Sequence, residues 1–179
     1  MKALFITREF PPYVYGGAGV HVEYLSKELA KLMEIDVSCF GDQDETNGAT
    51  TVKGYTYGGK KFESSNALLK PVLQTLHANI EMNIENIDAD IVHCHTWYSN
   101  FAGILAKLMY GTPLVVTTHS LEPLRPWKRE QLGRGYDTSA WIEKTTIEMA
   151  DAIIAVSEET KEDVLKHFDV EEGKIHVVY

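Results

Sequence analysis

The sequence has little of what would place a protein outside the cell or in a membrane. It contains two cysteines, Cys39 and Cys94, each inside an apolar stretch of a predicted strand, so reduced, buried thiols are expected rather than a disulfide. The apolar run that starts the chain turns polar at Thr7 and is too short for a secretory signal or a membrane span. These absences predict a cytoplasmic protein with no membrane partner.

Positive charge is scarce as well. There are 17 lysines and arginines against 26 acidic residues, which gives a net charge of -9. Polyanions are repelled by such a chain, so a nucleic-acid partner is not expected. The length of 179 residues and the hydrophobic content of 44% allow one sizeable core, and we expect a single domain over residues 1–179.

Apolar runs of strand length, rich in Val and Ile, alternate with helical patterns along the chain. Strands are predicted at residues 2–7, 35–40, 90–95, 114–118, 152–156 and 174–179, with a weaker one at 51–57. Helices are predicted at residues 22–32, 69–87, 98–110, 139–150 and 158–167, and a surface loop at residues 41–48. The alternation predicts an α/β fold with a doubly wound, Rossmann-like parallel sheet.

Three further expectations concern single positions. Ser157 should cap the helix that follows it, and Trp141 should belong to the core rather than to a binding site. Tyr179 closes a predicted strand with no helix or turn after it, which favours a longer parent protein cut at a domain boundary.

Candidate site residues gather where the predicted strands end. Ligands of open parallel sheets bind outside the carboxyl ends of the strands. The glycine-rich residues 15–19 follow the first strand, and their free backbone N–H groups could hold a phosphate or a sugar hydroxyl. The segments 93–97 and 119–120 follow two later strands. His119 is the strongest candidate, because a histidine that only fills core space is unusual at a strand end.

A metal site is not predicted. His93 and His95 project from one face of their strand and Cys94 from the other, but no third ligand stands at a recognisable spacing. Hydrogen-bonded histidines of the core or the cleft are the preferred interpretation. Motifs of other classes are missing too: there is no G-x-S-x-G turn of a hydrolase and no G-x-G-x-x-G of a dinucleotide fold.

The loop of residues 121–129 joins prolines, a tryptophan and three cations. Such a loop suits stacking on a sugar ring beside an anionic group. An ordinary exposed, proline-rich loop is the alternative.

Five segments resemble, in matching order, blocks of glycogen synthases and related retaining glucosyltransferases with two Rossmann domains, the GT-B architecture. They are residues 7–12, 15–21, 93–97, 118–128 and 155–157, and together they extend over most of the chain. The combination is specific, although each block alone is not. It implies the N-terminal, acceptor-side half of such an enzyme, whose C-terminal nucleotide-sugar domain is absent from this chain.

The resemblance implies transfer of glucose from ADP-glucose or UDP-glucose to the non-reducing end of an α-1,4-glucan, with retention and without a metal or cofactor. By matching position, His119 would be the catalytic residue that contacts the transferred glucose, and Gly16 and Gly17 would approach the donor. The other expected donor-side contacts are His95, Thr96, Trp97 and Ser120. The expected acceptor contacts are Tyr13, Arg125, Trp127 and Lys128. Because the C-terminal domain in cis would hold the nucleotide, residues 1–179 alone are expected to be inactive.

Two departures keep the substrates open. Many bacterial glycogen and starch synthases carry Lys where this chain has Val14, and Asp where it has Thr96. The segment 118–128 looks more like the synthases grouped with sucrose and trehalose enzymes, so an acceptor of the sucrose, trehalose or maltose-1-phosphate type is an alternative. A stand-alone carbohydrate-binding module is the alternative outside the enzymes.

Overall fold

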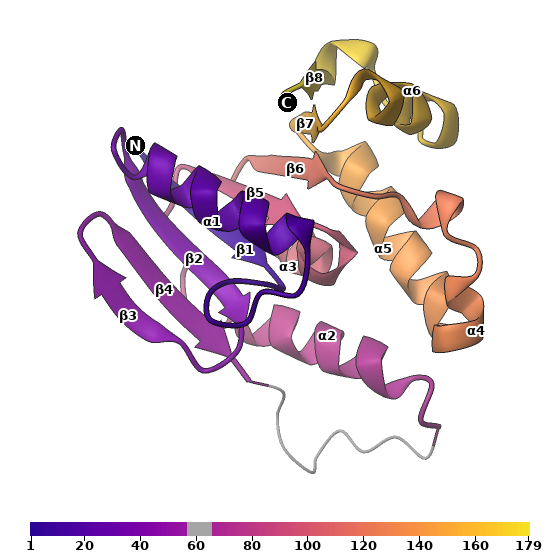
Figure 1. Cartoon of the computed structure of the whole chain (residues 1–179), viewed down its shortest axis with the longest axis horizontal. Coiled ribbons are helices and arrows are strands. Elements are labelled where there is room, and N and C mark those ends of the chain that lie inside the picture. The colour runs from indigo at the N-terminus through magenta and orange to yellow at the C-terminus, as the bar shows by residue number, and fades with distance from the viewer. Residues whose placement is uncertain (57–65) are drawn as a thin grey trace.

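The computed structural model describes residues 1–56 and 66–179. The strands are β1 (Lys2–Thr7), β2 (Glu34–Phe40), β3 (Asp44–Asn47), β4 (Thr50–Tyr55), β5 (Ile91–His95), β6 (Leu114–Thr118), β7 (Ala152–Ala155) and β8 (Ile175–Val177). They form one sheet in the order β3-β4-β2-β1-β5-β6-β7-β8, in which β3 pairs antiparallel with β4 and the other neighbours are parallel. The predicted doubly wound α/β sheet is confirmed (Figure 1).

The predicted surface loop at residues 41–48 is wrong in part, because β3 lies within it. All four residues of β3 are exposed and polar, so no alternation of apolar and polar side chains marks the strand in the sequence. The strand closes one edge of the sheet by pairing with β4 alone. The last residue of the weaker strand predicted at 51–57 lies outside the described residues.

The helices are α1 (Gly17–Leu29), α2 (Lys70–Glu81), α3 (Trp97–Tyr110), α4 (Lys128–Leu132), α5 (Gly135–Met149) and α6 (Glu158–His167), with 3-10 turns at Glu122–Leu124 and Glu172–Lys174. The predicted cap of α6 is confirmed, because the Ser157 hydroxyl accepts a hydrogen bond from the Thr160 amide at 3.1 Å.

Several apolar residues within the predicted helices lie at the surface instead of in the core. α2 ends at Glu81 rather than near residue 87, and Ile84 beyond it is 65% exposed. Leu32 lies past the end of α1 and is 79% exposed, and Trp141 on α5 is 56% exposed. Periodicity reports a helix face, whereas burial depends on whether another element covers that face.

Helices cover the two faces of the sheet unequally. α1 packs on one face, over Ala3, Phe5 and Val37, while α2, α3, α5 and α6 contribute to the core on the other. The reason is the right-handedness of the crossovers. The connection through α1 runs from β1 toward the β3 edge of the sheet, whereas the connections through α2, α3, α5 and α6 run toward the β8 edge.

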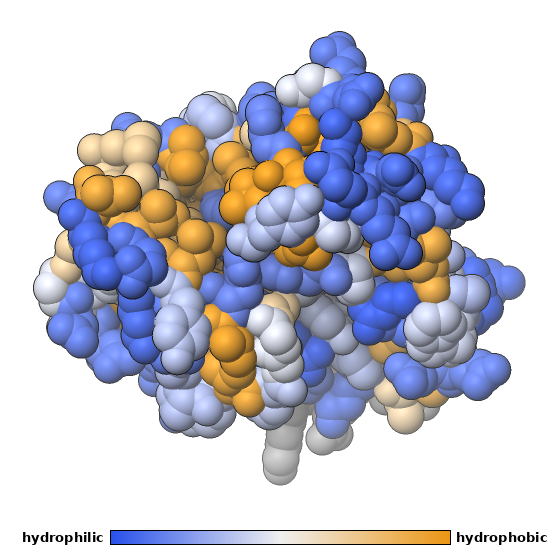
Figure 2. Space-filling view, turned by 45° about the horizontal axis from the view of Figure 1, so that its top comes forward, coloured by the Kyte–Doolittle hydropathy of each residue, from blue (hydrophilic) through white to orange (hydrophobic). Residues whose placement is uncertain are grey.

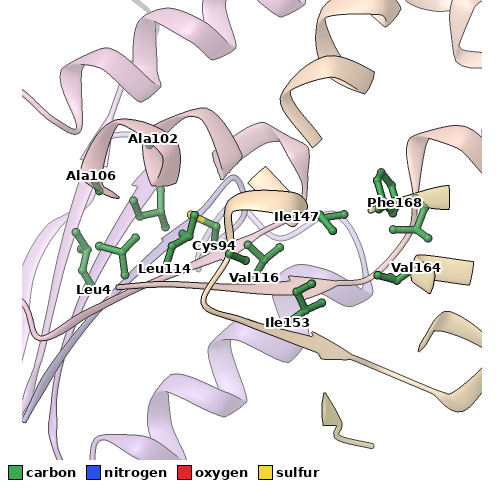
Figure 3. Close-up of a cluster of buried hydrophobic side chains, with 14 of the residues drawn as sticks. Leu4, Cys94, Ala102, Ala106, Leu114, Val116, Ile147, Ile153, Val164 and Phe168 are labelled. Carbon is green, nitrogen blue, oxygen red and sulfur yellow. The ribbon is translucent and has the colours of Figure 1, made fainter. Parts of the chain in front are cut away.

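The larger core depends on a close approach of α3 to the sheet. Figure 3 shows Cys94 and Leu114 on the strands pointing toward Ala102 and Ala106 of α3. A Cβ atom on Gly103 would lie 2.5 Å from the Cys94 sulfur, so only glycine fits there. Both cysteines are free and buried, as predicted, and burial raises the pKa of each thiol to about 12.

The surface is mixed in character. Figure 2 shows apolar side chains reaching one face of the molecule in separate patches among hydrophilic ones. Among the described residues, no helix is both long enough and apolar enough to cross a membrane.

Candidate functional site

The predicted rim segments meet at the carboxyl ends of β1, β5 and β6, around a cleft of about 470 Å³. The residues that line it are Arg8, Glu9, Gly16, Gly17, Ala18, Thr96, Trp97, Tyr98, His119, Ser120, Arg125 and Glu143. Seven residues predicted from the sequence are therefore brought together: Gly16, Gly17, Thr96, Trp97, His119, Ser120 and Arg125. His95 is fully buried and lies behind His119 rather than on the cleft surface.

The glycine-rich loop is held by Glu9. One carboxylate oxygen of Glu9 accepts hydrogen bonds from the backbone amides of Tyr15 and Gly16, both at 2.8 Å. A Cβ atom on Gly17 would meet nothing within 4 Å, whereas one on Gly19 would lie 2.8 Å from Glu9. There is thus open space beside Gly17, at the start of α1, whereas Gly19 is packed against Glu9.

Thr96 stands between β5 and α3 in a rare backbone conformation. Its φ of 68° and ψ of 160° are unusual for a residue with a side chain, and such a conformation costs about 1–3 kcal/mol. Its hydroxyl is buried without a hydrogen-bond partner among the described residues. Strain of this kind gathers at functional sites, and here it directs the start of α3 into the cleft.

Imidazoles form a cluster beneath the cleft. His95 Nδ1 lies 3.3 Å from His119 Nε2, and the ring of His21, from α1, lies 4.9 Å from that of His119 and 5.8 Å from that of His95. His93 shares the strand face with His95, as predicted, at a ring separation of 4.2 Å. The Nε2 of His93 is hydrogen-bonded to the hydroxyl of Thr117 at 2.7 Å.

These histidines are neutral at physiological pH. Burial, and to a lesser extent the neighbouring imidazoles, lower the pKa of His119 to about 4 and that of His93 to about 3. Burial likewise lowers the pKa of His21, and it holds the pKa of His95 well below its ordinary value. The cluster therefore offers neutral donors and lone pairs to the cleft rather than positive charge.

A second polar cluster, on the α5 side of the cleft, contains charges that are paired. Lys128 Nζ lies 2.6 Å from one carboxylate oxygen of Glu122, and Ser139 donates to the other at 2.8 Å. Glu143 accepts a hydrogen bond from the Glu122 amide at 2.6 Å. Burial raises the pKa of Glu143 to about 8, and the charge of Glu122 adds to that rise.

The residues predicted to contact the acceptor lie in different surroundings in the structure. The side chain of Lys128 is 7% exposed and engaged by buried Glu122, which disfavours a contact with an acceptor. Trp127 is 57% exposed and lies outside the cleft lining. Arg125 lines the cleft and donates to the Ser120 hydroxyl at 2.7 Å. Both cations pair with Glu122, but Lys128 does so at 2.6 Å and is buried, whereas Arg125 is 3.9 Å away and 34% exposed. The sequence could not separate them, because they stand three residues apart and only packing decides which one is buried.

Tyr13 lines a neighbouring hollow of about 330 Å³. The other residues around it are Arg8, Tyr15, Phe40, Gly41 and Thr56. Arg8 belongs to both linings and lies with its guanidinium 4.1 Å from the centre of the Tyr98 ring. The two hollows therefore adjoin at Arg8.

Arg8, Glu9, His21 and Glu143 are among the site residues that the sequence prediction does not include. Arg8 and Glu9 directly follow β1, so the strand-end rule that selected His119 also covers them. His21 and Glu143 lie inside α1 and α5, and nothing in their spacing marks them. Tertiary packing alone brings these two to the cleft.

The fold is a Rossmann-like α/β domain with its cleft at the carboxyl ends of the strands, where such sheets bind ligands. The family model described as Glycosyltransferase Family 4 matches residues 15–179, and the chain belongs to that family.

Curated relatives agree with this membership. The chain is 46% identical over 179 residues to an alpha-maltose-1-phosphate synthase of Mycolicibacterium smegmatis, covering 99% of this chain and 44% of the relative. It is 25% identical over 199 residues to a glycogen synthase of Mycobacterium tuberculosis, covering 99% of this chain and 47% of the relative. The chain thus spans less than half the length of the curated relatives it matches.

Solved structures show the same fold. The sucrose-phosphate synthase of Thermosynechococcus elongatus superposes with a TM-score of 0.73 at 15% identity, over 99% of this chain and 48% of that one. At this identity the likeness concerns the fold alone.

Proposed function

We propose that the chain is the N-terminal domain of a glucosyltransferase that makes α-maltose 1-phosphate. Formed in one transfer, that product requires a nucleoside-diphosphate glucose as donor and glucose 1-phosphate as acceptor. The glucosyl C1 then leaves the diphosphate oxygen and bonds to O4 of the acceptor, whose hydroxyl proton is released. The observation that carries the proposal is the 46% identity to an alpha-maltose-1-phosphate synthase along almost the whole chain.

The cleft suits an acceptor with a phosphate group. Although the chain carries a net charge of -9, Arg8 and Arg125 both line the cleft. Arginine binds phosphate through several N–H groups at once. One carboxylate oxygen of Glu9 is engaged by two backbone amides, and Glu143 has a pKa raised to about 8 by burial, so it is mostly protonated at neutral pH. The two arginines of the lining therefore face one carboxylate that is directed to the backbone and one that is mostly neutral.

His119 fits the role of a neutral hydrogen-bonding group toward the transferred glucose. Its depressed pKa keeps it uncharged near neutrality, and its Nε2 faces His95, which leaves the rest of the ring toward the cleft. A hydrogen bond to the sugar that strengthens as charge develops would lower the barrier to transfer. Gly16 and Gly17 leave space for the donor to approach the backbone.

The nucleotide contacts are assigned to a C-terminal domain in cis, so residues 1–179 alone should not turn over. The test measures glucosyl transfer from labelled ADP-glucose and UDP-glucose to glucose 1-phosphate and, separately, to glycogen. It compares the 179-residue chain with a gene product of the relatives' full length. Transfer to glucose 1-phosphate by the longer protein only is the expected result, and turnover by the short chain would overturn the division of labour.

A glycogen synthase is the second candidate function. It rests on the glycogen synthase relative at 25% identity and on the resemblance of the sequence blocks. The same assay separates the two, because a glycogen synthase extends glycogen and ignores glucose 1-phosphate. Transfer to neither acceptor would remove both candidates.

A further inference from the structure

The imidazole cluster holds more histidines than the proposed glucosyl transfer uses, since only His119 is assigned a contact with the sugar. His21, His95 and His119 come from α1, β5 and the segment after β6, and each offers one ring nitrogen within 4.8 Å of the others. Within the part of the chain that the structure describes, a single hydrogen bond, between His95 and His119, joins rings of this group, so hydrogen bonding does not account for the position of the His21 ring. We propose that these three histidines form a binding site for a divalent cation that prefers imidazole, of the zinc type.

The spacing of the rings is close to that of a three-histidine metal site. Zinc–nitrogen bonds of about 2.0–2.1 Å in tetrahedral geometry place ligand nitrogens about 3.4 Å apart and ring centres about 5 Å apart. His95 Nδ1 and His119 Nε2 are 3.3 Å apart, and the three ring-centre separations are 4.9, 5.6 and 5.8 Å. Closing the site needs only a small rotation of His21, whose side chain is half-buried.

An unpartnered nitrogen of His21 points to a missing ligand at the same place. Nε2 of His21 is buried and has no hydrogen-bond partner among the described residues, and an unsatisfied buried polar group costs about 1–3 kcal/mol. An ion held by Nδ1 of His95 and Nε2 of His119 would take Nε2 of His21 as its third ligand and relieve that cost. Nε2 of His95 belongs to the other side of its ring and is not a ligand in this arrangement.

The three donors are all imidazole nitrogens, and this selects the kind of ion. Borderline cations such as Zn²⁺, Ni²⁺ and Co²⁺ prefer imidazole nitrogen, whereas Mg²⁺ and Ca²⁺ prefer oxygen. His119 lines the cleft, so the fourth coordination position would open toward it.

The proposed site departs from the sequence prediction of no metal, which considered His93 and His95 and found no third ligand at a recognisable spacing. In the structure His93 is engaged by Thr117 instead. The other two proposed ligands, His21 and His119, stand 74 and 24 positions from His95 in the sequence. The fold alone brings them next to it.

The test titrates the 179-residue chain, freed of metal by a chelator, with ZnCl₂ by calorimetry and with CoCl₂ by visible absorption. One Zn²⁺ per chain and the visible bands of four-coordinate Co²⁺ with nitrogen ligands are expected. Because no sugar or nucleotide is added, the outcome does not depend on the proposed function. Binding of Mg²⁺ at equal strength would contradict the site.

Three variants assign the ligands. His21→Ala and His119→Ala should each weaken Zn²⁺ binding by more than roughly 100-fold, the upper range for losing even an outer partner of a metal ligand. His176→Ala removes an exposed histidine of β8 and should bind as the parent does. Circular dichroism in chelator checks that each variant is folded. Unchanged binding by folded His21→Ala would overturn the proposal, as would absence of Zn²⁺ binding by the parent chain.

Discussion

Two buried polar clusters flank the cleft, and they differ in how their charges are satisfied. On one side the ammonium of Lys128 meets the carboxylate of Glu122 at 2.6 Å, both nearly inaccessible to solvent. On the other side four imidazoles stand together, and neither His21 Nε2 nor His95 Nε2 has a partner among the described residues. Paired groups stabilise a fold, whereas unpaired ones persist where function maintains them.

The contrast assigns different work to the two clusters. The Glu122 cluster fixes the loop after β6 to α5 through Ser139 and through Tyr136, whose hydroxyl donates to the Glu122 carbonyl at 2.6 Å. It should govern stability. The imidazole cluster should govern chemistry, with a smaller share in stability.

The largest effect is expected from Lys128→Ala. Removal of the ammonium leaves the buried carboxylate of Glu122 with only the Ser139 hydroxyl and a long ion pair to Arg125 at 3.9 Å among the described residues. The free energy of unfolding should fall by about 3 kcal/mol, the lower end of the range for a broken buried pair. Lys31→Ala is the matched control, because the pair of Lys31 with Glu28 is exposed on both sides and is worth under about 1 kcal/mol. Urea denaturation measures both. Equal losses would refute the division between the clusters.

His119→Ala should do the opposite. In a gene product of the relatives' length, loss of a group that contacts the transferred sugar should reduce kcat/KM roughly 10²–10³-fold. The free energy of unfolding should change much less than in Lys128→Ala, since no buried charge is left unpaired. His176→Ala is the histidine control for both measurements. A destabilisation as large as that of Lys128→Ala would make His119 a structural residue.

Glu143 sharpens the comparison through pH. Its folded pKa of about 8 lies above its ordinary 4.5, so the protonated carboxyl favours the folded state. That contribution is complete below about pH 4.5 and is lost as the pH rises toward about 8. Glu143→Gln should abolish the loss, while the histidines titrate alike in both proteins. The measurement is the difference in unfolding free energy between the two proteins from about pH 5 to 8, which should grow with pH in favour of the variant.

Sequence patterns predicted what depends on local order along the chain. The buried strands and the cap at Ser157 are marked by their own residues, and the strand-end rule placed His119 and the glycine loop at one rim. Features decided by packing were missed. Exposed β3 carries no apolar signal, Lys128 differs from Arg125 only in what surrounds it, and His21 joins His119 across elements distant in sequence.

The smallest change in stability is expected for Gly17→Ala. A much larger change is expected for Gly19→Ala, two residues further along α1. A Cβ on Gly17 meets nothing within 4 Å and lies at the first position of α1, so Gly17→Ala should change the free energy of unfolding by less than about 0.5 kcal/mol. Gly19→Ala must displace Glu9, 2.8 Å away, and should cost about 1–3 kcal/mol.

Glucosyl transfer should depend on Gly17 even though stability does not. The methyl group of Gly17→Ala would fill space that the donor needs, so transfer by the longer protein should fall although the fold is intact. Thermal unfolding and donor KM, measured on both variants, test the two halves separately. A Gly17→Ala protein with unchanged KM would show that the open space beside Glu9 is not where the donor lies, while the stability ranking of the two glycines would still hold.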